Sequence, residues 1–396
     1  MEKRTIKLAD ISSCTGCAAC ADVCPKQCIT LTTHDTLHYY PQINQDECIR
    51  CGKCMISCPD LNPVETAPDF SQHFYAAWHK DEQERALSTS GGAGAALAEY
   101  AVKNGWTICG SVFDDAWNLS HKTGSTLSFL SKLRQSKYLQ SDTRGIIHEI
   151  EKILAAKDKV LFFGTPCQVA AVRKVIGNTN NLMTVEIICH GVNSPIVWKD
   201  YVKYLENKEQ DNLAYYNFRD KSKGWERPKG GPNLTVAMKF GQKSKFIQRA
   251  RYNLFHFWFG QHYILREACF NCKYRKENRV ADIVIGDFWG IEKIMPNADI
   301  KKGVSAIITN NGKGENFIKS INCEIQEVDK LKALTQLKGY IERRCENARM
   351  QDITKMHGFQ SEYLHTSFED MAKNYAPPTK LSYFIDRVKC FLRING

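Results

Sequence analysis

The chain has 396 residues, of which 43% are hydrophobic, and it carries a formal net charge of +11 at pH 7. This apolar fraction is typical of a globular protein and excludes wholesale disorder, and the length allows two or three domains. No apolar run approaches the ~18 residues of a membrane span, and no signal-like apolar segment precedes the first cysteine motif, so we expect a cytoplasmic protein.

The charge is unevenly distributed along the chain. Residues 1–70 contain six Lys/Arg and nine Asp/Glu, a net charge of −3, which leaves +14 for the remainder. A basic body suits an anionic small molecule such as a nucleotide cofactor, an acidic partner protein or a nucleic acid. Neither a recognised basic helix motif nor an aromatic-interleaved basic groove pattern is present, so we do not expect nucleic acid as a partner.

The first 65 residues contain an internal duplication of the spacing C-x2-C-x2-C-x3-C-P. It resembles the bacterial two-cluster ferredoxin, in which three cysteines of one copy share a [4Fe–4S] cluster with the last cysteine of the other copy. The first cluster is then expected on Cys14, Cys17, Cys20 and Cys58. The second is expected on Cys24, Cys48, Cys51 and Cys54. Two full copies, each with its proline, fit a pair of zinc sites or a disulfide knot poorly. We therefore predict an α+β ferredoxin-like 2[4Fe–4S] domain over residues 1–68, with a role in electron transfer.

The body of the chain alternates apolar strands with helices, which predicts an α/β domain with a mainly parallel sheet. Strands are expected in "GWTICGSVFDD", "DKVLFFG", "LMTVEII" and "ADIVIGD", and helices in "TRGIIHEIEKILAAK", "VAAVRKVIG" and after "NSP", where Ser194 is the expected N-cap and Pro195 the first helical residue. Cys109 lies within a predicted strand and is expected in the core. We divide this body into residues 74–155 and 156–325.

A helical C-terminal extension is predicted for residues 326–396. The stretches "LKGYIERRCENARM" and "LSYFIDRVKCFLRI" are typical of basic amphipathic helices. A helical cover over the α/β body is the simplest interpretation, and peripheral contact with a membrane surface or with a partner is the alternative.

Three of the predicted strands end in residues that can bind a metal or a cofactor. Cys167, Cys189 and Asp287 follow successive strands, and the pair Cys269 and Cys272 precedes the last of them. Because ligands of such sheets bind beyond the carboxyl ends of the strands, Cys167, Cys189, Cys269 and Cys272 form a natural four-ligand set for a third cluster. A separate zinc site and unligated buried cysteines remain open from the spacing alone.

The glycine-rich stretch "STSGGAGAAL" precedes the first strand of the body. Free N–H groups at the start of the following helix could hold a phosphate, but a tight turn with close helix packing explains the glycines equally well. The stretch also lacks the strand-before-helix order of the dinucleotide-binding fingerprint.

The assembled body resembles the coenzyme F-420 hydrogenase/dehydrogenase beta-subunit family over roughly residues 74–320. The matching stretches are "STSGG", "SKYLQSD", "GTPCQ", "CHGVNSP", "FRDKSKGW", "CFNCKY" and "IGDFWGI". Members of this family are iron–sulfur flavoproteins. Some stand-alone members carry a fused two-cluster ferredoxin, and several accompany genes of surface-polysaccharide synthesis.

The resemblance implies FAD as a cofactor and strengthens the expectation of a third [4Fe–4S] cluster. It places Ser90, Gly91 and Gly92 at the flavin phosphates. Along the flavin or its ribityl chain it places Lys137, Tyr138, Gln140 and Ser141. Beside the ring it places Thr165, Pro166 and Gln168. Asp287 is a candidate flavin contact, cluster ligand or loop cap.

Candidate acid–base residues near the expected flavin are His190, Arg219 and Asp220. The alternatives are a hydrogen bond from His190 to a cluster sulfur and a structural ion pair between Arg219 and Asp220. The expected function is that of an oxidoreductase that passes electrons between a redox partner protein (a ferredoxin, a flavodoxin or a hydrogenase/dehydrogenase subunit) and a small-molecule substrate, with a role in surface-polysaccharide synthesis as one implication. A non-catalytic electron-transfer subunit of a larger complex is the alternative, and the direction of electron flow is open.

Overall fold

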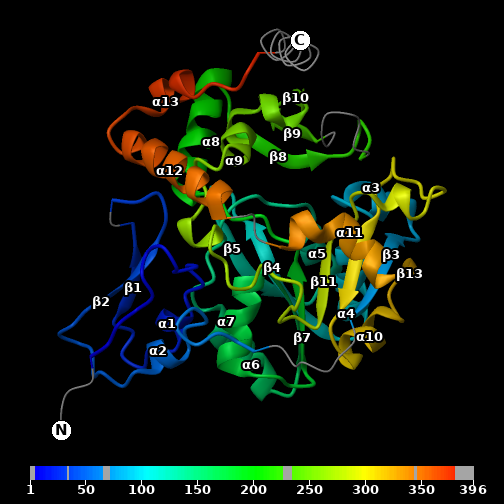
Figure 1. Ribbon diagram of the computed structural model, residues 1–396, viewed down its shortest axis with the longest axis horizontal. Helices are drawn as coiled ribbons and strands as arrows, with labels where there is room; N and C mark the ends of the chain where they lie inside the picture. Colours follow the sequence, from blue (N-terminus) through cyan, green and yellow to red (C-terminus); the bar gives the residue numbers. More distant parts are fainter. Residues whose placement is uncertain (1–4, 34, 66–71, 226–233, 343–345, 380–396) are drawn as a thin grey trace.

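The computed structural model describes residues 5–33, 35–65, 72–225, 234–342 and 346–379 (Figure 1). The N-terminal domain forms one side of the molecule, and the α/β body carries the remaining elements. None of the described helices is long and apolar enough to cross a membrane.

The N-terminal domain is a pair of short helices beside a two-stranded antiparallel sheet. Its elements are α1 (Ala19–Asp22), β1 (Ile29–Thr32), β2 (Tyr40–Ile43) and α2 (Lys53–Ile56). Each helix begins within one copy of the cysteine repeat, so the duplication in sequence is also a duplication in structure.

The body is built on an eight-stranded mixed sheet in the order β13-β3-β12-β11-β7-β6-β4-β5. These strands are β3 (His73–His79), β4 (Trp106–Phe113), β5 (Leu119–Gly124), β6 (Lys159–Gly164), β7 (Leu182–Ile187), β11 (Ile283–Asp287), β12 (Ser305–Thr309) and β13 (Cys323–Val328). The four predicted strands β4, β6, β7 and β11 are parallel and lie at the centre. Antiparallel pairs flank them on both sides, so the sheet is less uniformly parallel than predicted.

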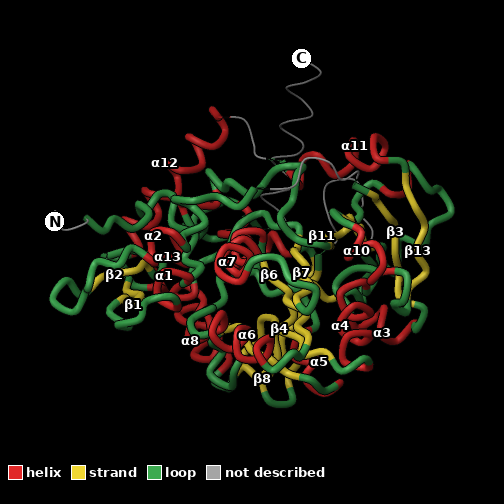
Figure 2. Tube along the Cα trace, turned by 90° about the horizontal axis from the view of Figure 1, so that it is seen from below, coloured by secondary structure: helices red, strands yellow, loops and turns green. Residues whose placement is uncertain are grey.

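Helices cover both faces of this sheet. Strand β6 shows how, because Leu161 joins the core cluster that contains α4, whereas Val160 and Phe162 join the cluster that contains α6 and α7. Figure 2 shows α4 and α11 on opposite sides of β3. The helices around the sheet are α3 (Glu82–Leu87), α4 (Ala93–Lys103), α5 (Leu127–Leu133), α6 (Ile146–Ala155), α7 (Pro166–Ile176), α10 (Gly312–Ile318) and α11 (Lys330–Ile341). Cys109 is fully buried in this core, as predicted.

A separate antiparallel sheet in the order β10-β9-β8 packs against a second group of helices. Its strands are β8 (Leu213–Asp220), β9 (Thr235–Phe240) and β10 (Lys243–Gln248), and the helices are α8 (Pro195–Glu209), α9 (Leu254–Gly260), α12 (Glu346–Tyr363) and α13 (Phe368–Asn374). Ser194 caps α8 as predicted, since its side chain accepts hydrogen bonds from the backbone N–H groups of Ile196 and Val197.

The described part of the C-terminal extension covers the body. Helix α11 packs on the eight-stranded sheet, and α12 and α13 pack on the core of the smaller sheet. The predicted boundary at residue 326 falls inside β13, and the helix predicted over 337–350 is divided, since α11 ends at Ile341 and α12 begins at Glu346. The last predicted helix lies outside the described residues.

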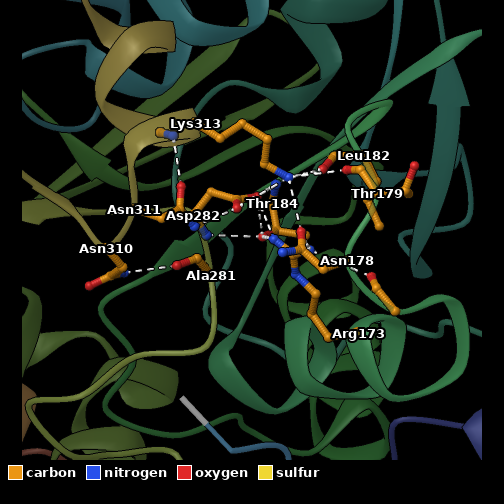
Figure 3. Close-up of polar contacts among 12 residues, drawn as sticks. Arg173, Asn178, Thr179, Leu182, Thr184, Ala281, Asp282, Asn310, Asn311 and Lys313 are labelled. Atoms are coloured by element: carbon orange, nitrogen blue, oxygen red, sulfur yellow. Dashed lines mark hydrogen bonds and ion pairs between the residues drawn. The ribbon is translucent and has the colours of Figure 1, made fainter. Parts of the chain in front are cut away.

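A buried polar network ties the central strands together (Figure 3). The Asp282 carboxylate, fully buried before β11, accepts hydrogen bonds from the Thr184 backbone N–H of β7 at 2.7 Å and from Arg173 of α7 at 2.6 Å. Burial alone would raise the pKa of Asp282, but Arg173 and Lys313 outweigh it and hold this pKa below its ordinary value. The network fixes β11 beside β7, and with it the strand ends that carry the candidate site.

Candidate cluster and cofactor site

The two cysteine loops of the N-terminal domain share one backbone conformation. Gly16 and Arg50 occupy equivalent places in the two copies and have positive φ angles of 67° and 55°. Ala18 and Gly52 are also equivalent, with φ angles of 60° and 78°. Left-handed residues at the same two positions curl each loop, so that the thiols of one copy gather around a common centre.

Each predicted N-terminal cysteine set lines its own hollow. One hollow, with about 430 Å³ of empty space, is bordered by Cys14, Cys17, Cys20 and Cys58. The other, with about 320 Å³, is bordered by Cys24, Cys48, Cys51 and Cys54, together with Cys28, whose sulfur lies 3.5 Å from that of Cys24. We call these groups the inner set and the outer set. The described structure therefore groups the eight cysteines in the two sets that the spacing rule predicts.

Burial and mutual repulsion disfavour free thiolates in the inner set. Burial, with a smaller contribution from the Cys14, Cys167 and Cys58 thiols, raises the pKa of the Cys17 thiol to about 12. The pKa of Cys20 is raised for the same reasons. Bound metal deprotonates a coordinating thiol and supplies the compensating positive charge, so this donor set fits an iron–sulfur cluster.

The four body cysteines meet at the carboxyl ends of β6 and β7, near the end of β11. These strands are adjacent and parallel, as the sequence predicted. Cys167 is the second residue of α7, Cys189 follows β7, and Cys269 ends a short 3-10 helix (Glu267–Cys269). Burial raises the pKa of Cys167 to about 12, and the Cys272 and Cys269 thiols add to the rise. We call Cys167, Cys189, Cys269 and Cys272 the body set.

Two sulfurs of the body set have polar neighbours within hydrogen-bond distance. The Val192 backbone N–H donates to Cys269 Sγ at 3.5 Å, and Thr165 Oγ1 lies 3.2 Å from Cys167 Sγ. Burial raises the pKa of Cys189 well above its ordinary value, and the other three thiols of the body set raise it further. In the described ranges, no group of three or more His, Cys, Asp or Glu residues is arranged to hold a single metal ion. The ligands of a four-iron cluster bind four different iron atoms and lie further apart than the ligands of one ion.

The inner set lies directly against the body. The Cys167 thiol of the body contributes to the raised pKa of Cys17 in the inner set. Burial raises the pKa of Tyr274, and Cys167 and Cys17 both add to this rise. The Tyr274 hydroxyl donates to the Pro59 carbonyl at 2.6 Å, immediately after Cys58. Tyr274 therefore lies between the inner set and the body set.

Further contacts fix this arrangement. The Thr143 hydroxyl donates to the Cys17 carbonyl at 2.9 Å, and the Gln140 amide donates to the carbonyl oxygens of Thr15 and Gly16 at 3.3 and 3.2 Å. A Cβ atom on Gly16 would lie only 2.3 Å from Gln140 Nε2. The resemblance placed Gln140 along the flavin, but in the structure its side chain serves the contact between the two domains.

The other predicted flavin segments lie side by side. The Thr89 hydroxyl accepts a hydrogen bond from the Ser136 N–H at 2.8 Å, which joins "STSGG" to "SKYLQSD". Ser141 in turn accepts from the Gln168 amide at 2.9 Å, which joins the second segment to "GTPCQ". Thr165 caps α7 in a capping box with Gln168, and Pro166 is the first helical residue. Of these segments, "GTPCQ" contains Cys167 of the body set.

The glycines of "STSGG" have a packing role of their own. A Cβ on Gly91 would lie 2.4 Å from the Ala77 carbonyl oxygen and 2.5 Å from the Ser305 nitrogen. Gly92 has a φ of 97° and begins α4. Close packing against β3 and β12 thus accounts for both glycines without a phosphate.

Two partly buried lysines border this region. Lys137 donates to the carbonyl oxygens at the end of α5, and Lys221 donates to the Ser90 carbonyl at 2.6 Å. Burial lowers the pKa of each lysine to about 7. An anionic group bound beside them would restore their charge, as expected of a site for a phosphate-bearing cofactor.

Arg219 does not pair with Asp220, contrary to the ion pair considered from the sequence. The two residues are neighbours in β8, where successive side chains point to opposite faces. Arg219 instead forms a buried bidentate ion pair with Asp287, to which Trp225 also donates at 2.8 Å. Burial would lower the pKa of Arg219, but Asp287 and Tyr138 raise it above its ordinary value.

His190 is exposed and belongs to a histidine pair. Its Nε2 lies 2.8 Å from His262 Nε2, and His262 Nδ1 lies 3.1 Å from the Asp352 carboxylate of α12. Sequence reasoning missed His262 and Asp352, which lie in no motif, and Lys221, which lies within the quoted stretch "FRDKSKGW". Arg266 was also missed, although it stands three residues before Cys269.

Two family models match the chain. Residues 13–61 match the 4Fe-4S dicluster domain, and residues 157–334 match the model for the C terminus of the coenzyme F420 hydrogenase/dehydrogenase beta subunit. An uncharacterized protein of Methanocaldococcus jannaschii, MJ1349, is 22% identical over 373 residues, which cover 81% of this chain and 93% of that protein. A chain of the F420-reducing [NiFe] hydrogenase complex from Methanosarcina barkeri aligns with a TM-score of 0.41 and 16% identity, over 76% of this chain and 94% of that one.

Proposed function

Because residues 157–334 belong to the coenzyme F420 hydrogenase/dehydrogenase beta subunit family and residues 13–61 form a 4Fe-4S dicluster domain, we propose that this protein is an iron–sulfur flavoprotein oxidoreductase. It exchanges electrons between a redox partner protein and a small-molecule substrate, in either direction. We further propose that the inner, outer and body sets each hold one [4Fe–4S] cluster and that the region around Tyr138 and Ser90 binds FAD.

The observation that carries the proposal is the sequence of three cysteine sets leading from the N-terminal domain into the body. The inner set is held against the body set by Tyr274, Thr143 and Gln140. Clusters transfer single electrons, whereas a flavin collects two and exchanges a hydride, so a chain with both connects one-electron and two-electron chemistry.

The residues around the proposed flavin have separate tasks. Lys137 and Lys221 hold positive charge at the anionic part of the cofactor. Arg219, locked by Asp287, presents a permanent charge beside Tyr138. The Val192 backbone N–H donates a hydrogen bond to a sulfur of the body set and thereby favours the more negative state of the cluster.

The test is an anaerobic preparation analysed for iron, acid-labile sulfide and released flavin. We expect about twelve irons per chain, from three clusters of four, and one FAD. Eight irons without flavin would leave only the dicluster domain and refute the oxidoreductase. Twelve irons without turnover of any small molecule by the isolated protein would instead favour a non-catalytic electron-transfer subunit.

Substitution of one cysteine separates the sets. Cys269→Ser is expected to remove about four irons and to leave the two N-terminal clusters in place. Cys323→Ser is the control, because Cys323 is a buried cysteine of β13 and lies outside the three sets. Equal iron contents in the two variants would contradict a cluster on the body set.

A further inference from the structure

Arg266 is a fully buried arginine at the contact between the two domains. Its Nε donates to the Cys14 carbonyl at 2.6 Å, one Nη donates to the Tyr39 carbonyl at 3.0 Å, and the other donates to Gln140 Oε1 at 2.9 Å. The guanidinium also lies over the ring of Tyr40, 4.1 Å from its centre. Every one of these partners is electrically neutral.

The charge of Arg266 is therefore not balanced by any carboxylate hydrogen-bonded to it among the described residues. An isolated buried cation costs several kcal/mol, and buried charges in proteins are normally paired. The nearby His38 does not share the charge, because burial and Arg266 lower the pKa of His38 to about 3. A guanidinium placed in this way needs an anion that the polypeptide alone does not supply.

The groups that can supply this anion are the cysteine sets on its two sides. One Nη of Arg266 lies 3.7 Å from Cys14 Sγ of the inner set. On the side of the body set, the Arg266 carbonyl accepts a hydrogen bond from the backbone N–H of Cys269 at 3.0 Å. A single residue that carries a buried cation thus contacts ligands of two different sets.

We propose that Arg266 tunes the reduction potentials of the clusters on the inner and body sets and holds these two sets in register. This inference rests on the proposed function, since it concerns clusters bound by these cysteines. The reduction takes up one electron from the redox partner protein or the reduced substrate of that function, and no bond forms or breaks at the cluster ligands. The cluster gains one negative charge, which the adjacent guanidinium stabilises, so the reduced state is favoured on both sets.

The direct contact with Cys14 predicts the larger effect on the inner cluster. Arg266→Gln removes the charge, and we expect the equilibrium constant for reduction of the inner cluster to fall about tenfold, which is about 59 mV for a one-electron couple. The body cluster, which the charge of the guanidinium reaches only through space, is expected to shift in the same direction by less. The outer cluster serves as an internal reference and should keep its potential.

The experiment is an anaerobic redox titration followed by electron paramagnetic resonance, with the iron content determined on the same samples. Arg266→Lys keeps the charge and should keep most of the potential. Gln140→Glu, which sets a carboxylate where Arg266 now meets an amide oxygen, should lower the same potential without removing the arginine. Arg173→Lys is the matched control, because Arg173 is likewise buried but is paired with Asp282, and it should shift no cluster.

The outcomes separate the two proposals. A wild-type protein with fewer than about twelve irons contradicts the proposed function and leaves no inner and body clusters to compare. If Arg266→Gln keeps its full iron content and its cluster potentials are unchanged, the role of Arg266 alone is overturned. If Arg266→Gln loses iron, unchanged potentials in Gln140→Glu overturn it instead. A selective shift of the inner cluster supports it.

Discussion

Asp22 provides a measurable link between the N-terminal domain and the body. Its carboxylate is 7% exposed and accepts hydrogen bonds from the backbone N–H groups of Gly145 at 2.8 Å and Ile147 at 3.2 Å. These groups lie at the start of α6, whose N-cap is Gly145 and which therefore has no capping side chain of its own. A residue of one domain thus caps a helix of the other.

The size of the effect follows from what Asp22→Ala leaves behind. Loss of an N-cap costs about 1 kcal/mol. One buried N–H, that of Ile147, is left without a partner, which costs about 1–3 kcal/mol more. We expect a total of about 2–4 kcal/mol, which would raise the frequency of local opening at the start of α6 roughly 30- to 900-fold.

Asp22→Asn is expected to behave differently. Burial raises the pKa of Asp22 above its ordinary value, so the charged form is disfavoured in the folded protein and the contribution of Asp22 to stability falls as the pH rises above about 3.9. Asn keeps one acceptor oxygen, which can serve the buried Ile147 N–H, but its NH2 group cannot accept from Gly145, so at neutral pH we expect a loss of about 1 kcal/mol, smaller than that of Asp22→Ala.

Hydrogen exchange of the backbone amides of residues 145–150 is the appropriate assay, because it reports local opening in the intact protein. Glu151→Ala is the control, since Glu151 lies on the exposed side of α6, where it pairs with His148 of the same helix, and takes no part in the cap. Unchanged exchange in Asp22→Ala, or equally fast exchange in Asp22→Asn, would show that the cap does not join the domains.

Two further substitutions test the supports of the site. Asp282→Ala strands Arg173 in the core and should cost about 3–5 kcal/mol in urea denaturation at neutral pH. The deficit should shrink as the pH falls through the lowered folded-state pKa of Asp282, because the stabilisation by this carboxylate is present only above its unfolded value of about 3.9. Gly16→Ala should open the cysteine loop of the first copy, since the added Cβ would lie 2.3 Å from Gln140 Nε2. Amide exchange in this loop should therefore become faster. Arg50→Ala, at the equivalent exposed position of the second copy, should leave the exchange of its own loop unchanged.

Local features of the sequence predicted the elements that depend on local chemistry. The cysteine spacing predicted the two N-terminal sets, and apolar runs predicted the four central strands, because such patterns constrain the chain over a few residues. The pairing of β3 with β12 and β13 was not predicted, since it joins segments more than 200 residues apart. The Arg219–Asp287 pair was missed because β8 and β11 belong to different sheets, so no local pattern brings the two residues together.

The differences between the two cysteine copies carry information that their shared spacing hides. In the first copy, Gly16 is small and buried, and it lets Gln140 and Arg266 of the body approach the loop. At the position equivalent to Gly16 the second copy has Arg50, which adopts the same left-handed conformation but is exposed. The backbone of the loop therefore does not require glycine there, and the close approach of the body does. A duplicated motif with a buried glycine in one copy and an exposed charged residue at the same position of the other thus indicates which copy is covered, and here it points to the inner set as the one that meets the body.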